Sequence, residues 1–255
     1  RRLIDHCAAR GVVFLSSPFD LESIDLLDAL DVPAFKVPSP DCVSTSYLEH
    51  MGRKGRPVIL STGMCDIGEV GAGIATLRAA GSEAIALLHC TSCYPAPAEE
   101  LNLAVIPAMA AALGLPVGYS DHSDGTAVSI AAVALGARII EKHLTLDRGL
   151  PGPDHKASLE PAEFAAMVRG IRQVERATGS PIKAPQPCER SARELGRRSV
   201  ATARALPAGH RLTASDLVLL RPGTGIAPRF EAAIIGRTTA RPVGEACLLD
   251  WADLA

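Results

Sequence analysis

The sequence lacks long apolar runs and blocks of charge of one sign. None of its apolar stretches approaches the roughly 18 to 20 residues of a membrane-spanning helix, and its first residues do not have the form of a signal peptide. Its 26 basic and 28 acidic residues are interspersed and give a formal charge of -2. The composition therefore gives no reason to expect nucleic acid or a membrane as partner, and small polar or anionic substrates stay open.

Cysteine is present, but not in the pattern of a disulfide scaffold. The seven cysteines are odd in number and lie far apart, whereas small secreted domains carry a dense, even set. We therefore expect a cytoplasmic protein in a reducing compartment. Cys90 and Cys93 have CxxC spacing, but no second pair completes a zinc site, so we expect neither redox nor metal chemistry from them.

Short apolar runs alternate with segments of helical periodicity, as at residues 20–30, 68–80 and 126–135. The runs are apolar throughout, which is typical of parallel strands buried on both faces. The six predicted strands are residues 11–15, 34–37, 57–60, 84–88, 116–119 and 137–140.

Each predicted strand ends in polar or ionisable residues, as in a barrel whose site lies at the strand C-termini. A doubly wound sheet would usually place a glycine-rich phosphate loop after one strand, and none is present. We therefore predict a (β/α)8 TIM barrel. Such a barrel needs eight strands, residues 1–6 read as the middle of an amphipathic helix, and the chain has no initiator methionine. We expect that the first two βα units are missing upstream.

The composition changes after the helical segment 161–177. Glycine, serine and proline at 179–187 and a charged stretch at 189–198 predict a linker. The remainder has short apolar runs, prolines and glycines with little helical periodicity. We predict a partial barrel at 1–178, a linker at 179–196 and a small domain of turns and short strands at 197–255.

His122 and His143 follow successive predicted strands, whose ends are neighbours in a barrel. Two neutral imidazoles directed into one mouth can hold a divalent metal and leave positions open for water and substrate. The alternative is that local hydrogen bonds satisfy both rings.

Several hydroxyl groups and one lysine occupy the other strand ends. Together they could surround a phosphate or carboxylate, although each serine alone would be an ordinary helix cap or turn residue. These residues are Ser17, Lys36, Ser39, Ser61 and Ser120.

Seven motifs then follow in order: FLSSPFD at 14–20, FKVPS at 35–39, VILSTGM at 58–64, LLHCTSCYPAP at 87–97, GYSDH at 118–122, IIEKH at 139–143 and PGPDH at 151–155. Together they resemble the sialic acid synthase family, including bacterial relatives that make legionaminic and pseudaminic acids. The tail, with LLRPGTGI at 219–226, resembles the antifreeze-like or SAF domain fused to those enzymes.

The resemblance implies an α/β TIM barrel followed by a small β-rich SAF domain. It implies a transferase that condenses phosphoenolpyruvate with an N-acetylated hexose to give a nine-carbon 2-keto acid. It also implies a divalent metal, usually Mn²⁺ with Mg²⁺ or Co²⁺ possible, and a homodimer in which the SAF domain of one subunit covers the barrel mouth of the other.

Residue roles follow from the same resemblance. Metal ligands are implied at His122 and His143, phosphate contacts at Ser17, Ser39, Ser61 and Ser120, a carboxylate contact at Lys36, sugar contacts at Tyr94 and Asp154, and an arginine delivered by the SAF domain at Arg221.

The chain departs from the family pattern at three places. Ser92 stands where many members have asparagine and still offers a hydroxyl to phosphoenolpyruvate. Asp41 stands where many bacterial members have glutamate. The family's glutamate on its first strand and lysine on its second have no counterpart here, so part of the active site is missing. Six predicted strands would also leave two unpaired sheet edges, so we expect these 255 residues alone to be poorly soluble or inactive.

Several alternatives remain at this level. The acceptor could be N-acetylmannosamine or a 2,4-diacetamido sugar, which would make the enzyme a sialic, legionaminic or pseudaminic acid synthase; FDLES and KVPS favour the bacterial sialic or legionaminic branch. Another phosphoenolpyruvate-condensing barrel is a rival that the SAF-like tail argues against. The third alternative is an inactive fragment or a non-catalytic binding protein.

Overall fold

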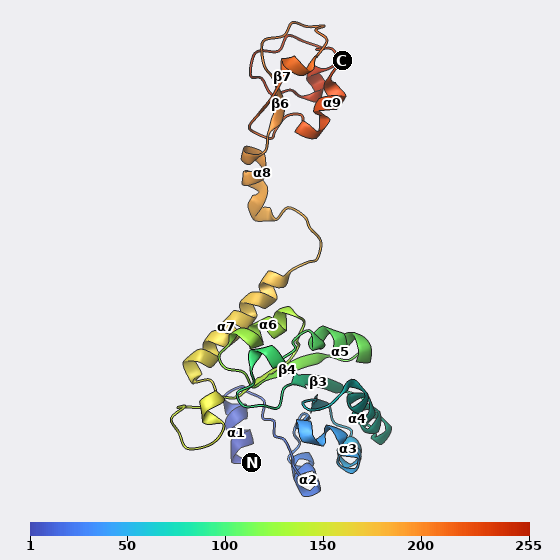
Figure 1. The fold of residues 1–255 in the computed structure, drawn as a ribbon, viewed down its shortest axis with the longest axis vertical. Coiled ribbons are helices and arrows are strands. Elements are labelled where there is room, and N and C mark those ends of the chain that lie inside the picture. The colour runs from blue at the N-terminus through green and yellow to red at the C-terminus, as the bar shows by residue number, and fades with distance from the viewer. The chain divides into compact units, whose positions relative to one another are not determined.

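The computed structural model describes residues 1–255 and divides the chain into two compact units, Arg1–Gly179 and Ser180–Ala255 (Figure 1). No helix in it combines the length and the apolar character needed to cross a membrane.

The first unit is built on a five-stranded parallel sheet with strand order β1-β2-β3-β4-β5. Because neighbours in the sequence are also neighbours in the sheet, every connection turns in the same way and the sheet is a half-barrel. The strands are β1 (Phe35–Val37), β2 (Val58–Ser61), β3 (Ile85–Cys90), β4 (Val117–Asp121) and β5 (Ile140–Lys142).

From α2 onward helices alternate with these strands and follow one another around the outside of the sheet, and α1 precedes α2 with no strand between them (Figure 1). They are α1 (Arg2–Ala9), α2 (Leu21–Ala29), α3 (Thr45–Gly52), α4 (Ile67–Ala80), α5 (Val105–Leu113), α6 (Ala127–Ala134) and α7 (Pro161–Thr178). Local sequence sets several ends. A capping box between Asp66 and Glu69 starts α4, and Gly81, with φ of 117°, ends it.

The core of this unit lies between the sheet and the helices. Alternate strand residues such as Phe35, Leu60, Leu87 and Tyr119 are fully buried against it. The period of two along each strand directs the residues between them to the opposite face, and this second face carries the polar side chains described below.

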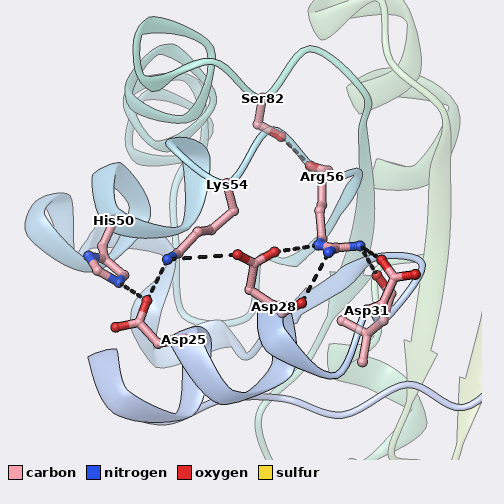
Figure 2. A network of polar contacts seen from close by, with 8 residues as sticks. Asp25, Asp28, Asp31, His50, Lys54, Arg56 and Ser82 are labelled. Carbon is pink, nitrogen blue, oxygen red and sulfur yellow. Dashed lines mark hydrogen bonds and ion pairs between the residues drawn. The ribbon is translucent and has the colours of Figure 1, made fainter.

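Partly exposed ion pairs tie α2 to the segment after α3 (Figure 2). Lys54 Nζ lies 2.5 Å from Asp25 Oδ1, and Arg56 Nε donates to Asp28 Oδ1 at 2.7 Å. The Arg56 backbone oxygen accepts from Ser82 Oγ at 2.7 Å. The network therefore links α2 to the chain that enters β2 and, through Ser82, to the chain that enters β3.

The strand predicted at residues 11–15 is wrong, because the structure has irregular backbone there. A strand exists through its pairing, and this segment has no hydrogen-bonded neighbour in the sheet. Val12 and Val13 are accordingly 57% and 72% exposed.

The sixth predicted strand is displaced: it was expected at 137–140 and forms at Ile140–Lys142. Ala137 N still bonds back to Ala132 O, in the turn that ends α6.

The second unit contains an antiparallel pair, β6 (Ser199–Thr202) and β7 (Leu217–Leu220), preceded by α8 (Arg190–Gly196) and followed by α9 (Glu231–Ile234). Isolated bridges such as Leu206 with Val243 close the remaining turns. Its core is a separate apolar cluster around Val200, Ile234 and Leu249. The range 179–196, predicted as a linker, therefore includes the helix α8.

Candidate functional site

The C-terminal ends of all five parallel strands open into one cavity of about 500 Å³. Each strand contributes one inward side chain: Lys36, Ser61, Cys90, Ser120 and Glu141. The loops that follow the strands, with the segment before α2, add the remaining polar and aromatic lining: Ser17, Phe19, Ser39, Ser92, Tyr94, His122 and His143.

Lys36 is the cation of this cavity and is nearly buried. Its Nζ donates to Ser61 Oγ at 2.7 Å and to the Val37 carbonyl at 3.1 Å, and lies 3.6 Å from Glu141 Oε2. Burial lowers the pKa of Lys36, and the Glu141 carboxylate opposes that shift. The Lys36 amino group is thus held at a fixed point with a hydroxyl beside it, an arrangement that suits an anion when the group is charged.

Glu141 belongs to the site but was not among the residues singled out from the sequence. Its Oε1 accepts a 2.6 Å hydrogen bond from Ser120 Oγ, while Oε2 faces Lys36. The signal was available in IIEKH, because positions 141 and 143 share one face of a strand. The carboxylate thus bridges β1 and β4 across the cavity.

Gly63 permits the close approach of three chain segments on the same side of the cavity. Its backbone N–H donates to Ser39 Oγ at 3.0 Å. A Cβ at this position would lie 2.3 Å from Ser92 Oγ, 2.9 Å from Ser39 Oγ and 3.2 Å from Cys90 Sγ. The absence of a side chain at this position lets both serine hydroxyls converge.

His122 has a fixed tautomer. Its Nδ1 lies 2.8 Å from the Thr91 carbonyl oxygen, which can accept but not donate, so Nδ1 carries the proton. The lone pair is therefore on Nε2, which lies 3.4 Å from Ser120 Oγ. The Tyr94 ring covers the imidazole, with 4.1 Å between ring centroids.

His143 lies beside His122, with 5.5 Å between ring centroids. Burial first, and then the neighbouring His122, lower the pKa of His143. A neutral ring is the form that can donate a lone pair to a metal. No cluster of three or more histidine, cysteine, aspartate or glutamate side chains suited to a metal is present, so these two nitrogens would leave most coordination positions to water or substrate.

A buried ion pair lies on the helix-covered side of the same two strand ends. Asp121 and Lys142 have fully buried side chains, with Nζ 3.1 Å from Asp121 Oδ2. Ser129 Oγ donates to Oδ2 at 2.5 Å, and Ser123 N and Oγ donate to Oδ1 at 2.9 and 2.7 Å. Since His122 and His143 each follow a member of the pair, it fixes both backbones where the rings enter the cavity.

Comparison with known proteins agrees with this arrangement. The NeuB family model matches residues 1–183, which is most of the chain. The chain belongs to the NeuB family. The SAF domain model matches residues 197–255, and from here the two units are called the NeuB unit and the SAF unit.

Named relatives of the NeuB family cover most of the chain. The N,N'-diacetyllegionaminic acid synthase of Legionella pneumophila is 43% identical over 94% of this chain and 69% of its own. The human N-acetylneuraminate-9-phosphate synthase is 38% identical over 96% of this chain and 68% of its own. A solved N-acetylneuraminic acid synthetase from Leptospira borgpetersenii superposes with a TM-score of 0.71 at 34% identity, covering 75% of this chain and 67% of that one.

Three predicted residues lie outside the strand-end cavity. Asp154 is exposed in the NeuB unit, and its charge acts on His143 and Tyr94 without a direct bond to either. Asp41 accepts from Ser44 Oγ at 3.2 Å within its own turn. Arg221 belongs to the SAF unit, where its Nε donates to the Gly196 carbonyl at 2.9 Å.

Proposed function

We propose that this chain carries out the sialic acid synthase reaction, the condensation of phosphoenolpyruvate with an N-acetylated hexose such as N-acetylmannosamine. The observation that carries the proposal is the single cavity into which five strands direct an ammonium group, hydroxyls and two imidazoles. The relatives are named as sialic, legionaminic and pseudaminic acid synthases, which supports the same reaction class.

Phosphoenolpyruvate is anionic, and the cavity offers donors on two sides. Lys36 with Ser61 suits its carboxylate, and the hydroxyls of Ser17, Ser39, Ser92 and Ser120 suit its phosphate. The Glu141 carboxylate opposes the lowering of the Lys36 pKa by burial. Fixed donors of this kind stabilise developing charge without having to reorient during the reaction.

His122 and His143 would hold a divalent ion, for which Mn²⁺ is the first candidate and Mg²⁺ or Co²⁺ are alternatives. The fit rests on the Nδ1 proton of His122 being committed to Thr91 O, so that Nε2 is free, and on the neutral ring of His143. Bound there, such an ion would supply a Lewis acid for an aldehyde oxygen.

The bond changes are those of an aldol-type condensation. C3 of phosphoenolpyruvate bonds to the aldehyde carbon of the open-chain sugar, whose oxygen takes a proton. Water adds its hydroxyl at C2 and releases a proton, and the C2–O bond to phosphate then breaks to give the 2-keto acid and phosphate. Tyr94, packed on His122, and Asp154 are proposed to face the sugar.

The acceptor has a second candidate, a 2,4-diacetamido sugar. Two N,N'-diacetyllegionaminic acid synthases are 43% and 42% identical to this chain, against 32% for a pseudaminic acid synthase. Phosphate release by the full-length protein, measured with phosphoenolpyruvate and each acceptor in turn, separates the two candidates. No release with either would contradict the proposed reaction.

The metal proposal has its own test. His122→Ala or His143→Ala should lower phosphate release by roughly a hundredfold or more and remove tightly bound metal, and chelation should do the same. His6→Ala, an exposed histidine on α1, is the matched control and should behave as wild type. An undiminished rate in excess chelator would reject the metal.

We further propose that Arg221 acts on the partner subunit's site in a homodimer. Full-length His122→Ala mixed with full-length Arg221→Ala should recover roughly a quarter of wild-type activity, because half of the dimers then contain one sound site. If verified subunit exchange gives no recovery, Arg221 does not act between subunits.

A further inference from the structure

Five arginines of the SAF unit line one cleft of about 660 Å³, separate from the strand-end cavity. They come from α8, from the turn after it and from the segment before α9: Arg190, Arg193, Arg197, Arg198 and Arg229. The acidic side chain among the lining residues is Glu194. The cleft therefore has a large excess of positive charge.

The backbone around this cleft is held by close contacts. Gly223 N donates to the Glu194 carbonyl at 2.6 Å, and a Cβ on Gly223 would lie 2.6 Å from Arg197 Cβ. Ser199 Oγ donates to the Pro222 carbonyl at 2.7 Å and accepts from Gly225 N at 2.9 Å. The end of α8 and the loop 221–225 are thus joined, so the guanidinium groups project from a fixed frame.

None of these five arginines forms an ion pair within the chain. Other arginines of the SAF unit do: Arg204 pairs with Asp216 and Arg241 with Asp253. Residues 180–255 carry 11 arginines and lysines against 7 aspartates and glutamates, a formal charge of +4, whereas residues 1–179 carry 15 against 21, a charge of -6. The uncompensated charge is concentrated at this cleft, where it would attract anions.

The chemistry of the lining favours phosphates over an aromatic base. Guanidinium groups bind phosphate oxygens through paired N–H donors. No aromatic residue is among the lining residues, and Phe230, which follows Arg229 in the chain, already has the Arg229 guanidinium 4.7 Å from its centroid and Trp251 packed against it, with 5.5 Å between centroids. Phe230 therefore offers little free ring surface on which a base could stack.

We propose that this cleft is a second anion site, which binds an oligophosphate group such as pyrophosphate or the phosphate chain of a nucleotide. The site is independent of the condensation reaction proposed above. Several guanidinium groups around one cleft fit a ligand with more than one phosphate better than orthophosphate, because each added phosphate can meet a further pair of donors.

Calorimetric titration of the full-length protein at low salt tests the proposal. Pyrophosphate should bind at least about tenfold more tightly than orthophosphate, and Arg193→Gln/Arg197→Gln should weaken pyrophosphate binding by roughly tenfold or more. Arg229→Gln, from the other wall, should weaken it independently. The control Arg169→Gln/Arg176→Gln removes two charges from exposed positions of α7 and should bind as wild type.

The remaining arms exclude other sources of binding. Lys36→Met alters the strand-end cavity and should leave pyrophosphate affinity unchanged. If this variant instead lost pyrophosphate binding, the ligand would lie in the strand-end cavity and the proposal would be overturned. Adenosine triphosphate should bind no more than about tenfold tighter than tripolyphosphate; a larger gain would show base recognition and overturn the oligophosphate class. The proposal would also be overturned if wild type and the double cleft variant bound pyrophosphate equally. The same holds if a cleft variant changed subunit association and nothing else.

Discussion

Each unit of this protein contains one aspartate with no exposed surface, Asp121 in the NeuB unit and Asp216 in the SAF unit. Both carboxylates accept several hydrogen bonds and both face a cation. The cations differ: the Lys142 side chain is 0% exposed, whereas that of Arg204 is 61% exposed. Asp216 also accepts from His210 and from Thr213.

The difference lies in what could replace the cation. Water can reach the position of Arg204 and solvate Asp216 if the guanidinium is lost, but it cannot reach that of Lys142. A buried charge without its partner costs far more than an exposed pair contributes. The NeuB unit therefore depends on its ion pair, and the SAF unit depends more on its hydrogen bonds.

The largest effect is expected for Lys142→Met. The free energy of unfolding of the NeuB unit should fall by about 3 to 5 kcal/mol, because Asp121 stays buried without its cation. Chemical denaturation measures this loss. The double variant Asp121→Asn/Lys142→Met should recover a large part of it, and a single-variant loss below about 1 kcal/mol would remove the distinction between the units.

An intermediate effect is expected for Asp216→Asn. The amide keeps the shape but loses one acceptor oxygen, which leaves donors of Thr213 or His210 unpaired at a cost of about 1 to 3 kcal/mol. Thermal unfolding of the SAF unit measures the change. A cost equal to that of Lys142→Met would show that hydrogen bonds and a buried cation are equivalent here.

Acid provides a second test of Asp216. Hydrogen bonds from His210 first, and then from Thr213, hold the pKa of Asp216 well below its usual range. Stability from a depressed carboxyl pKa is fully present above the unfolded value of about 4 and is lost as the pH falls further. The SAF unit should therefore lose stability below about pH 4 in wild type and less in Asp216→Asn.

A small effect is expected for Arg204→Gln, whose exposed guanidinium should contribute no more than about 1 kcal/mol to the free energy of unfolding.

The smallest effect is expected for Asp25→Asn, whose side chain is exposed in the ion-pair network of α2 (Figure 2). Its melting temperature should match wild type at physiological salt and fall measurably at low ionic strength. A salt-independent loss for either variant would show that it acts through packing.

The local pattern of apolar and polar residues was sufficient to predict much of the fold of the NeuB unit. Runs buried on both faces identified five of the strands, and the position of Lys36 and Ser120 at strand ends placed them at one mouth. Pairing is not local, so the apolar residues 11–15 were misread as a strand although no neighbour bonds to them. Glu141 was missed because a single glutamate in a strand becomes informative once Lys36 and Ser120 are known to lie beside it.

The SAF unit was less predictable for a related reason. Its bridges join positions far apart, as in Ala201 with Leu248, and most involve single residues with no periodic signature. The roles of Asp154 and Arg221 come from family resemblance and stay predictions, since neither lines the strand-end cavity.

Gly63 has a consequence for how this family can vary. A Cβ at position 63 would meet two serine hydroxyls and a thiol, so a larger residue fits only if these side chains turn away from it. At Gly71 on α4, by contrast, no atom lies within 4 Å of the place that a Cβ would occupy. In a library that randomises both codons, selection for function should return mainly glycine at the first, because other residues would displace the two serine hydroxyls from the cavity, and a broad range of residues at the second.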